Sequence, residues 1–189
     1  MNIENISAEE AIERLRNGNR EYIGSEKCAG SISLARRRET AINGQVPYAV
    51  VISCSDSRVI PENIFSAGIG DLFVIRVAGN VMDDHQLGSV EYAVSHLGVR
   101  LVLVLGHNKC GAVEAAVHHD PDGYIKFITD EIRKAVGDEK DEYKACCLNV
   151  RHSMDIIEQS FSIHMEEERG LKVIGAVYHI EDGTVSFDV

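Results

Sequence analysis

Residues 99–111 read VRLVLVLGHNKCG, a continuous apolar run that ends in a histidine and a cysteine. Three further runs of the same kind lie elsewhere in the chain, at Tyr48–Cys54, Leu72–Val77 and Lys172–Tyr178. Strands that are apolar throughout, rather than at alternate positions, are typical of sheets covered on both faces, as parallel sheets are. We therefore predict four central strands, Val99–Leu105 and these three runs, in a mainly parallel sheet.

Helical stretches fall between these strands, and this alternation indicates an α/β fold with helices flanking the sheet. The helices are predicted at Gln86–Leu97, Gly111–Val117, Tyr124–Val136 and Asp141–Glu168. A C-terminal strand, Thr184–Val189, follows a turn at Glu181–Gly183, so we expect it to lie antiparallel to the strand before it.

The chain opens with a capping-box pattern at Ser7–Glu10, and apolar residues follow at helical spacing. We predict an amphipathic helix over Ala8–Tyr22, whose apolar stripe must pack on the chain's own core or on a partner subunit. The sequence contains no repeat and no linker-like segment. We expect one domain over residues 1–189, with an N-terminal helical arm (1–24) and an α/β core (45–189).

Composition and charge exclude several classes of function. The 189 residues suffice for one domain, and the formal net charge of −11 repels nucleic acids and anionic lipids. No apolar run reaches the roughly 18 residues of a transmembrane helix. The acidic N-terminal segment lacks the basic start and apolar centre of a signal peptide. We therefore expect a cytoplasmic protein that binds neither nucleic acid nor membrane.

Two of the predicted strands end in residue types that bind metals. One ends in Cys54, and the other is followed by His107 and Cys110. Ligands in open α/β sheets bind beyond the carboxyl ends of the strands, so the topology places these side chains along one edge of the sheet. Two thiolates and one imidazole suit a catalytic zinc ion that keeps its fourth position for water. The sequence predicts a zinc site at these three residues.

Asp56 and Arg58 follow Cys54 at alternate positions, so an extended chain would place all three on one face. Arg58 can hold the Asp56 carboxylate in a charge-assisted pair. The carboxylate can then accept a hydrogen bond from a zinc-bound hydroxide, or take the fourth coordination position itself. Free, mostly buried thiols are expected at the remaining cysteines, Cys28, Cys146 and Cys147.

These segments resemble the beta class of carbonic anhydrases over most of the chain. Cys54–Arg58 (CSDSR) matches the family's first metal signature, and Gly106–Ala112 (GHNKCGA) matches the second. Gly70–Asn80 (GDLFVIRVAGN) and Ser89–Ala93 (SVEYA) match two further family segments, and Gln45–Pro47 resembles the entry into the first strand. As a set, these matches are highly specific.

The resemblance implies that Cys54, His107 and Cys110 hold one zinc ion per chain and that Asp56 and Arg58 form a catalytic dyad. It also implies a carbon dioxide pocket lined by Gln45, Phe73, Ala78, Tyr92 and the backbone N–H of Gly111. The pocket is expected at the interface of a homodimer or higher homo-oligomer, with the N-terminal helix lying across the partner. The implied reaction is the reversible hydration of carbon dioxide to bicarbonate and a proton, by attack of a zinc-bound hydroxide.

One subgroup of the family holds bicarbonate at an inhibitory site. It carries Trp three residues before the first metal cysteine and Gly directly before that cysteine. Those positions are Val51 and Ser53 here, so we expect Asp56 to pair with Arg58 and leave water on the zinc. The histidine pair at 118–119 has two interpretations, a proton relay or two solvated surface residues.

Other functions stay open at this point. Family members with a similar site hydrolyse carbonyl sulfide or carbon disulfide, and loops that a sequence does not reveal select the substrate. A zinc-binding module without catalysis would not need Asp56 and Arg58, which are both present. A nucleotide-binding Rossmann protein does not fit, because no G-x-G-x-x-G follows the first strand.

Overall fold

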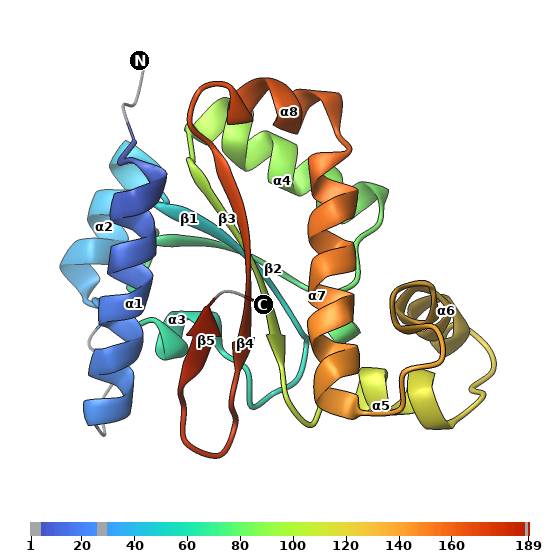
Figure 1. Cartoon of the computed structure of the whole chain (residues 1–189). Helices are drawn as coiled ribbons and strands as arrows, with labels where there is room; N and C mark the ends of the chain where they lie inside the picture. The colour runs from blue at the N-terminus through green and yellow to red at the C-terminus, as the bar shows by residue number, and fades with distance from the viewer. Residues whose placement is uncertain (1–4, 26–29, 188) are drawn as a thin grey trace.

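A five-stranded sheet forms the centre of the protein in the computed structural model, which describes residues 5–25, 30–187 and 189 (Figure 1). The strands are β1 (Ala49–Ser53), β2 (Leu72–Arg76), β3 (Leu101–His107), β4 (Lys172–Tyr178) and β5 (Val185–Phe187). Their order across the sheet is β2-β1-β3-β4-β5. The first four are parallel, and β5 lies antiparallel to β4, which confirms the predicted sheet.

The third strand differs from its prediction in a way that affects the site. It was expected at Val99–Leu105, but it begins at Leu101 and continues to His107. His107 pairs with Tyr178 in the register of β3 and β4. The imidazole is therefore carried by the sheet itself, with a fully buried side chain, rather than by the loop that follows.

Helices cover both faces of the sheet (Figure 1). They are α1 (Ala8–Gly24), α2 (Leu34–Asn43), α3 (Pro61–Ile64), α4 (Asp84–Leu97), α5 (Gly111–His118), α6 (Ile125–Val136), α7 (Glu142–Glu158), α8 (Phe161–Glu167) and the 3-10 turn η1 (Ala78–Asn80). One face, with Val51 and Leu103, packs against α1 and α3. The other, with Val50 and Val104, packs against α4, α7 and α8. Burial on both faces explains why the central strands are apolar along most of their length rather than at alternate positions.

The long helix predicted over Asp141–Glu168 is wrong, because two helices occupy this stretch. α7 ends at Glu158, and α8 begins after Ser160, whose hydroxyl accepts a hydrogen bond from the backbone N–H of Ile163 at 3.4 Å. Such a cap begins a new helix. α8 then lies beside α4, where it helps to cover the sheet.

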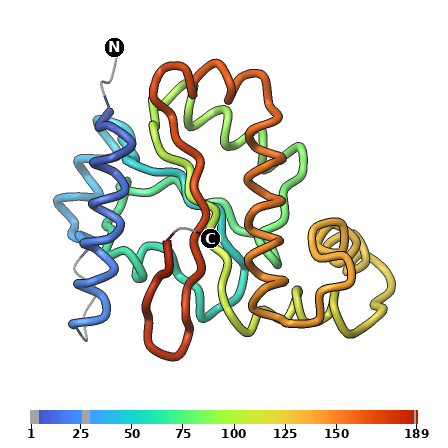
Figure 2. The backbone as a smooth tube through the Cα atoms, in the orientation of Figure 1, coloured from blue at the N-terminus to red at the C-terminus, as the bar shows by residue number. Residues whose placement is uncertain are grey.

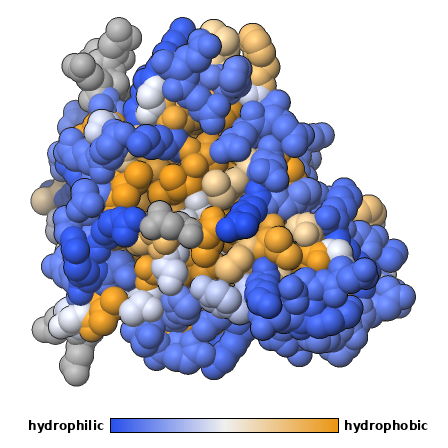
Figure 3. All heavy atoms as spheres, in the orientation of Figure 1, coloured by the Kyte–Doolittle hydropathy of each residue, from blue (hydrophilic) through white to orange (hydrophobic). Residues whose placement is uncertain are grey.

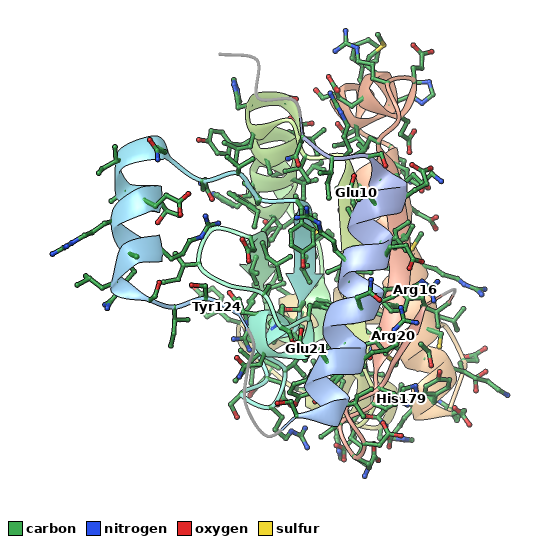
Figure 4. The ribbon with its side chains drawn as sticks, turned by 90° about the vertical axis from the view of Figure 1, so that its left-hand side faces the viewer. Glu10, Arg16, Arg20, Glu21, Tyr124 and His179 are labelled. Atoms are coloured by element: carbon green, nitrogen blue, oxygen red, sulfur yellow. The ribbon has the colours of Figure 1, made fainter. Side chains whose placement is uncertain are left out.

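The apolar stripe of the N-terminal helix, expected on the chain's own core or on a partner subunit, packs on its own chain. Ala11 and Leu15 are fully buried in the same cluster as Val51. The charged side chains of Glu10 and Arg20 lie on the exposed side of α1 (Figure 4). Ala11 and Leu15 therefore belong to the core of this chain, whereas Ile23 near the end of α1 is 47% exposed.

Helix α2, which was not predicted from the sequence, is exposed where α1 is buried. Within the described chain none of its residues is buried, and Leu34 and Ile42 are 54% and 82% exposed. In Figure 4, α2 lies at the left-hand side of the view, apart from α1. None of the helices in the described part of the chain has the length and apolarity to cross a membrane.

Candidate metal centre

Cys54, His107 and Cys110 converge at the carboxyl edge of the sheet. Cys54 directly follows β1, His107 ends β3, and Cys110 is the residue before α5. Because β1 and β3 are adjacent and parallel, their ends meet. The potential ligand atoms of the three residues all lie within 4.8 Å of one another, and all three side chains are buried. The structure thus brings together the three residues proposed as zinc ligands from the sequence.

The ring of His107 is oriented to present one nitrogen to this group. Its Nδ1 lies 2.8 Å from the carbonyl oxygen of Asn108. A carbonyl only accepts, so Nδ1 carries the proton and Nε2 carries the lone pair. Nε2 is buried and has no hydrogen-bond partner among the described residues. A buried polar atom without a partner is costly, and a metal ion would satisfy this one.

The two thiols interact, and their pKa values shift in opposite directions. The pKa of Cys54 is lowered, first because Cys110 donates a hydrogen bond to its sulfur. The backbone N–H groups of Asp56 and Gly79, at 3.4 and 3.3 Å from Sγ, act in the same direction. The pKa of Cys110 is raised because its proton is held by the neighbouring Cys54 sulfur. A metal dication would replace that proton, and two thiolates with one imidazole fit zinc.

Asp56 and Arg58 form a two-pronged ion pair beside the group. Arg58 Nε donates to Asp56 Oδ1 at 3.0 Å, and Nη2 donates to Oδ2 at 2.7 Å. The backbone N–H of Arg58 also donates to Oδ1 at 2.8 Å. These bonds from Arg58 hold the pKa of Asp56 at about 2, so the carboxylate stays charged at neutral pH. The expected pairing of Asp56 with Arg58 is confirmed.

Arg76 is a further residue of the site, to which the sequence alone assigns no role. It ends β2, opposite Ser53 in the register. Its Nε donates to the carbonyl of Cys54 at 3.0 Å, and its Nη2 donates to the carbonyl of Asp56 at 2.7 Å. It therefore holds the backbone that carries a metal ligand and the dyad. The sequence signal that could have identified Arg76 is its position as a lone arginine at the end of an apolar strand.

The residues expected to line the substrate pocket separate into two groups. Gly111 directly follows Cys110, and Ala78 precedes Gly79, whose N–H reaches the Cys54 sulfur, so both lie near the metal group. Gln45, Phe73 and Tyr92 lie elsewhere.

Phe73 pairs with Val50, four residues before Cys54, which corresponds to about 13 Å along the strand. The rings of Phe73 and Tyr92 lie 6.2 Å apart, Tyr92 is 47% exposed, and Gln45 is exposed in the segment before β1. Phe73 therefore lies on the edge strand β2, partly buried against the core, with the exposed Tyr92 beside it.

The remaining histidines and cysteines of interest lie around this frame. His118 ends α5, and its Nε2 lies 3.5 Å from a carboxylate oxygen of Glu142, which joins α5 to α7. Cys146 is buried and its thiol lies 3.3 Å from the carbonyl of His107, where it donates a hydrogen bond. Cys147 is half-buried, and neither cysteine forms a disulfide. Cys28 lies outside the described residues.

Comparison with known proteins agrees with this geometry. The family model described as carbonic anhydrase matches residues 49–185. A carbonic anhydrase of Mycolicibacterium smegmatis is 35% identical, with 90% of this chain and 88% of the relative covered. Carbonic anhydrase 2 of Mycobacterium tuberculosis is 37% identical, with 89% and 87% covered.

Solved structures show the same fold. The beta-carbonic anhydrase CafA of Aspergillus fumigatus superposes with a TM-score of 0.71 at 27% identity, covering 82% of this chain and 88% of that one. A Coccomyxa beta-carbonic anhydrase in complex with acetazolamide gives 0.70 at 29% identity, with 81% and 78% covered. A tetrameric beta-carbonic anhydrase of Sordaria macrospora gives 0.69 at 27% identity, with 81% and 90% covered.

Proposed function

Because the chain belongs to the beta-class carbonic anhydrase family of enzymes, we propose that it catalyses the reversible, zinc-dependent hydration of carbon dioxide to bicarbonate and a proton. The observation that carries this proposal is the buried convergence of Cys54, His107 and Cys110, with the unpartnered Nε2 of His107 among them. These three side chains would hold the ion. Zinc bound there would supply a coordination position at which water loses a proton near neutral pH.

Asp56 would orient the reacting water. Its carboxylate is ionised at neutral pH, and hydrogen bonds from Arg58 lower its pKa to about 2. It can therefore accept a hydrogen bond from water and fix the direction in which the oxygen lone pair points. Both oxygens of Asp56 are bonded to Arg58, and Arg76 holds its backbone carbonyl, so the carboxylate is rigidly placed.

The apolar part of the pocket would come from a second copy of the chain. Phe73 and Tyr92 lie too far along the sheet to contact the metal group of their own chain, yet they are half-buried or exposed at the β2 edge. Leu34 and Ile42 are exposed on α2, which Arg36 joins to Asp71 directly before β2, and these apolar side chains support burial against a partner. We propose that Gln45, Phe73 and Tyr92 reach the metal group of that partner across a homodimer interface.

A second apolar surface supports a larger homo-oligomer. Apolar residues gather in the middle of the face that carries β4 and β5 (Figure 3). A groove of about 230 Å³ runs there between α1 and α7, with Ile12, Met154 and Ile174 among its lining residues. The solved relative from Sordaria macrospora is tetrameric.

The proposed location of the protein is the cytoplasm. The four cysteines among the described residues form no disulfide, which supports a reducing compartment.

Stopped-flow hydration of carbon dioxide tests the proposed reaction. We expect rapid hydration by the zinc-loaded protein and a fall in kcat of about 100-fold in Asp56→Asn, which removes the charged acceptor with little change in shape. Zinc content should be equal in the two proteins. A zinc-loaded protein that does not hydrate carbon dioxide, but hydrolyses carbonyl sulfide or carbon disulfide, would reject the proposed substrate.

A further inference from the structure

We propose that Glu181, in the turn between β4 and β5, is a positioning residue for the metal centre. It would act by holding the two consecutive residues whose carbonyl groups fix His107 and Arg58. The inference rests on the proposed function, because it assigns a role in the same site. Figure 2 shows that the turn between β4 and β5 lies at the same end of the sheet as the segment that follows β3.

Both carboxylate oxygens of Glu181 contact this segment. Oε2 accepts a hydrogen bond from Asn108 Nδ2 at 2.7 Å, and Oε1 lies 2.5 Å from Lys109 Nζ. One side chain thus bridges two neighbouring residues that lie between the second and third proposed ligands. We call these two contacts the Glu181 bridge.

Asn108 is held by the same hairpin through its backbone and its amide. Its N–H donates to the carbonyl of Tyr178 at 3.1 Å, and its Oδ1 accepts from the N–H of Ile180 at 3.0 Å. Together with Glu181, these bonds fix the orientation of the Asn108 carbonyl. That carbonyl accepts from His107 Nδ1, so it determines which ring nitrogen faces the two thiols.

Lys109 connects the bridge to the dyad. Its φ of 52° lies in the left-handed region, which a residue with a side chain occupies only when its surroundings hold it there. In this conformation its carbonyl accepts a hydrogen bond from Arg58 Nη2 at 3.1 Å. The same Nη2 donates to Asp56 at 2.7 Å. Release of the Lys109 side chain would therefore let Arg58, and with it Asp56, move.

Exposure separates this role from a general effect on stability. Lys109 and Glu181 have side chains that are 61% and 47% exposed. Exposed ion pairs of this kind contribute little to the free energy of unfolding. Loss of the Glu181 bridge should therefore leave the melting temperature almost unchanged while it alters the affinity for zinc and the rate of turnover.

The test compares Glu181→Ala with Asp182→Ala in the same turn. The Asp182 carboxylate accepts only from Thr184 among the hydrogen bonds described, so its loss perturbs the turn but not the bridge. Zinc release to an excess of chelator and kcat for carbon dioxide hydration are measured on each zinc-loaded protein. In Glu181→Ala we expect zinc release to be about tenfold faster and kcat to be about tenfold lower, with KM unchanged. Asp182→Ala should behave as the unsubstituted protein.

Glu181→Gln supplies the rescue experiment. Its amide oxygen can still accept from Asn108, but the charge that holds Lys109 is lost, so both rates should lie between those of Glu181→Ala and the unsubstituted protein. Zinc release and kcat within twofold of the unsubstituted protein in Glu181→Ala would overturn the inference, as would equal effects in Asp182→Ala. If the unsubstituted, zinc-loaded protein shows no hydration, the proposed function fails, and zinc release still decides the role of Glu181.

Discussion

Arg58 donates two parallel hydrogen bonds to the carboxylate of Asp56, from Nε to Oδ1 at 3.0 Å and from Nη2 to Oδ2 at 2.7 Å. Parallel bonds of this kind give a guanidinium and a carboxylate a fixed mutual orientation, which a lysine could not provide. The positive charge of Arg58 balances the negative charge of Asp56 within this pair. The negative charge of the two cysteine thiolates is therefore left to be balanced by the zinc ion.

The ion pair predicts how stability depends on pH. The pKa of Asp56 is about 2 in the folded protein, below its ordinary value of 3.8, because Arg58 donates hydrogen bonds to the carboxylate. The resulting stabilisation is therefore complete above about pH 5 and is lost progressively as the pH falls through 3.8 toward 2. Asp56→Asn should lose less unfolding free energy than the unsubstituted protein over this range. Urea unfolding at pH 5 and pH 3 measures the difference, and equal losses in both proteins would contradict it.

The division of the pocket between two chains predicts complementation. Cys54→Ala removes a metal ligand, and Phe73→Ala removes part of the proposed pocket that serves the partner. In a mixed dimer, the chain with Phe73→Ala keeps its metal group and receives an intact Phe73 from the other chain. After dissociation and random reassociation of equal amounts, we expect about a quarter of the unsubstituted activity, since half of the dimers would be mixed and each would hold one intact site.

The control for this experiment places both substitutions on one chain and mixes it with the unsubstituted protein. Each site of a mixed dimer then has one defect, so mixed dimers should be inactive. If instead the control mixture keeps one active site per mixed dimer and the first mixture shows none, Phe73 serves the metal group of its own chain.

Because Leu15 on α1 is buried and Leu34 on α2 is exposed, substitution of each leucine by alanine should affect a different property, folding or association. Leu15 is fully buried in the core, so Leu15→Ala should lower the free energy of unfolding by about 2–5 kcal/mol. Leu34 is 54% exposed on α2, so Leu34→Ala should weaken association between chains more than it weakens folding. Urea unfolding and sedimentation at several concentrations separate the two effects. A Leu15→Ala protein that folds as stably as the unsubstituted chain, but dissociates, would contradict the placement of Leu15 in the core of its own chain.

The sheet and the metal group could be predicted because each depends on local pattern and simple topology. Continuous apolar runs mark buried strands, and parallel strands bring the residues that follow them to one edge. The same reasoning placed His107 next to Cys54 although 53 residues separate them in the sequence. The break at Ser160 was missed because helical periodicity continues across it and a serine cap is a weak signal within a helical pattern.

The contacts that support the metal centre could not be predicted from pattern. Arg76 reaches Cys54 across neighbouring strands, and Glu181 reaches Asn108 from 73 residues away. Both are polar residues at the ends of elements, where a sequence gives no register. The direction of the α1 stripe was equally undetermined, because an amphipathic helix packs as well on its own core as on a partner. Only the three-dimensional arrangement distinguishes these cases.

The central claim is that one zinc ion held by Cys54, His107 and Cys110 makes this chain a carbonic anhydrase. Zinc is removed from the protein with a chelator and returned in steps, and carbon dioxide hydration is measured after each addition alongside the bound zinc. We expect activity to be absent from the metal-free protein, to rise in proportion to bound zinc, and to saturate at one zinc per chain, with neither binding nor activity in Cys54→Ala. Two results would contradict the claim. One is hydration that persists without zinc, and the other is a Cys54→Ala protein that binds one zinc per chain and hydrates carbon dioxide at the unsubstituted rate.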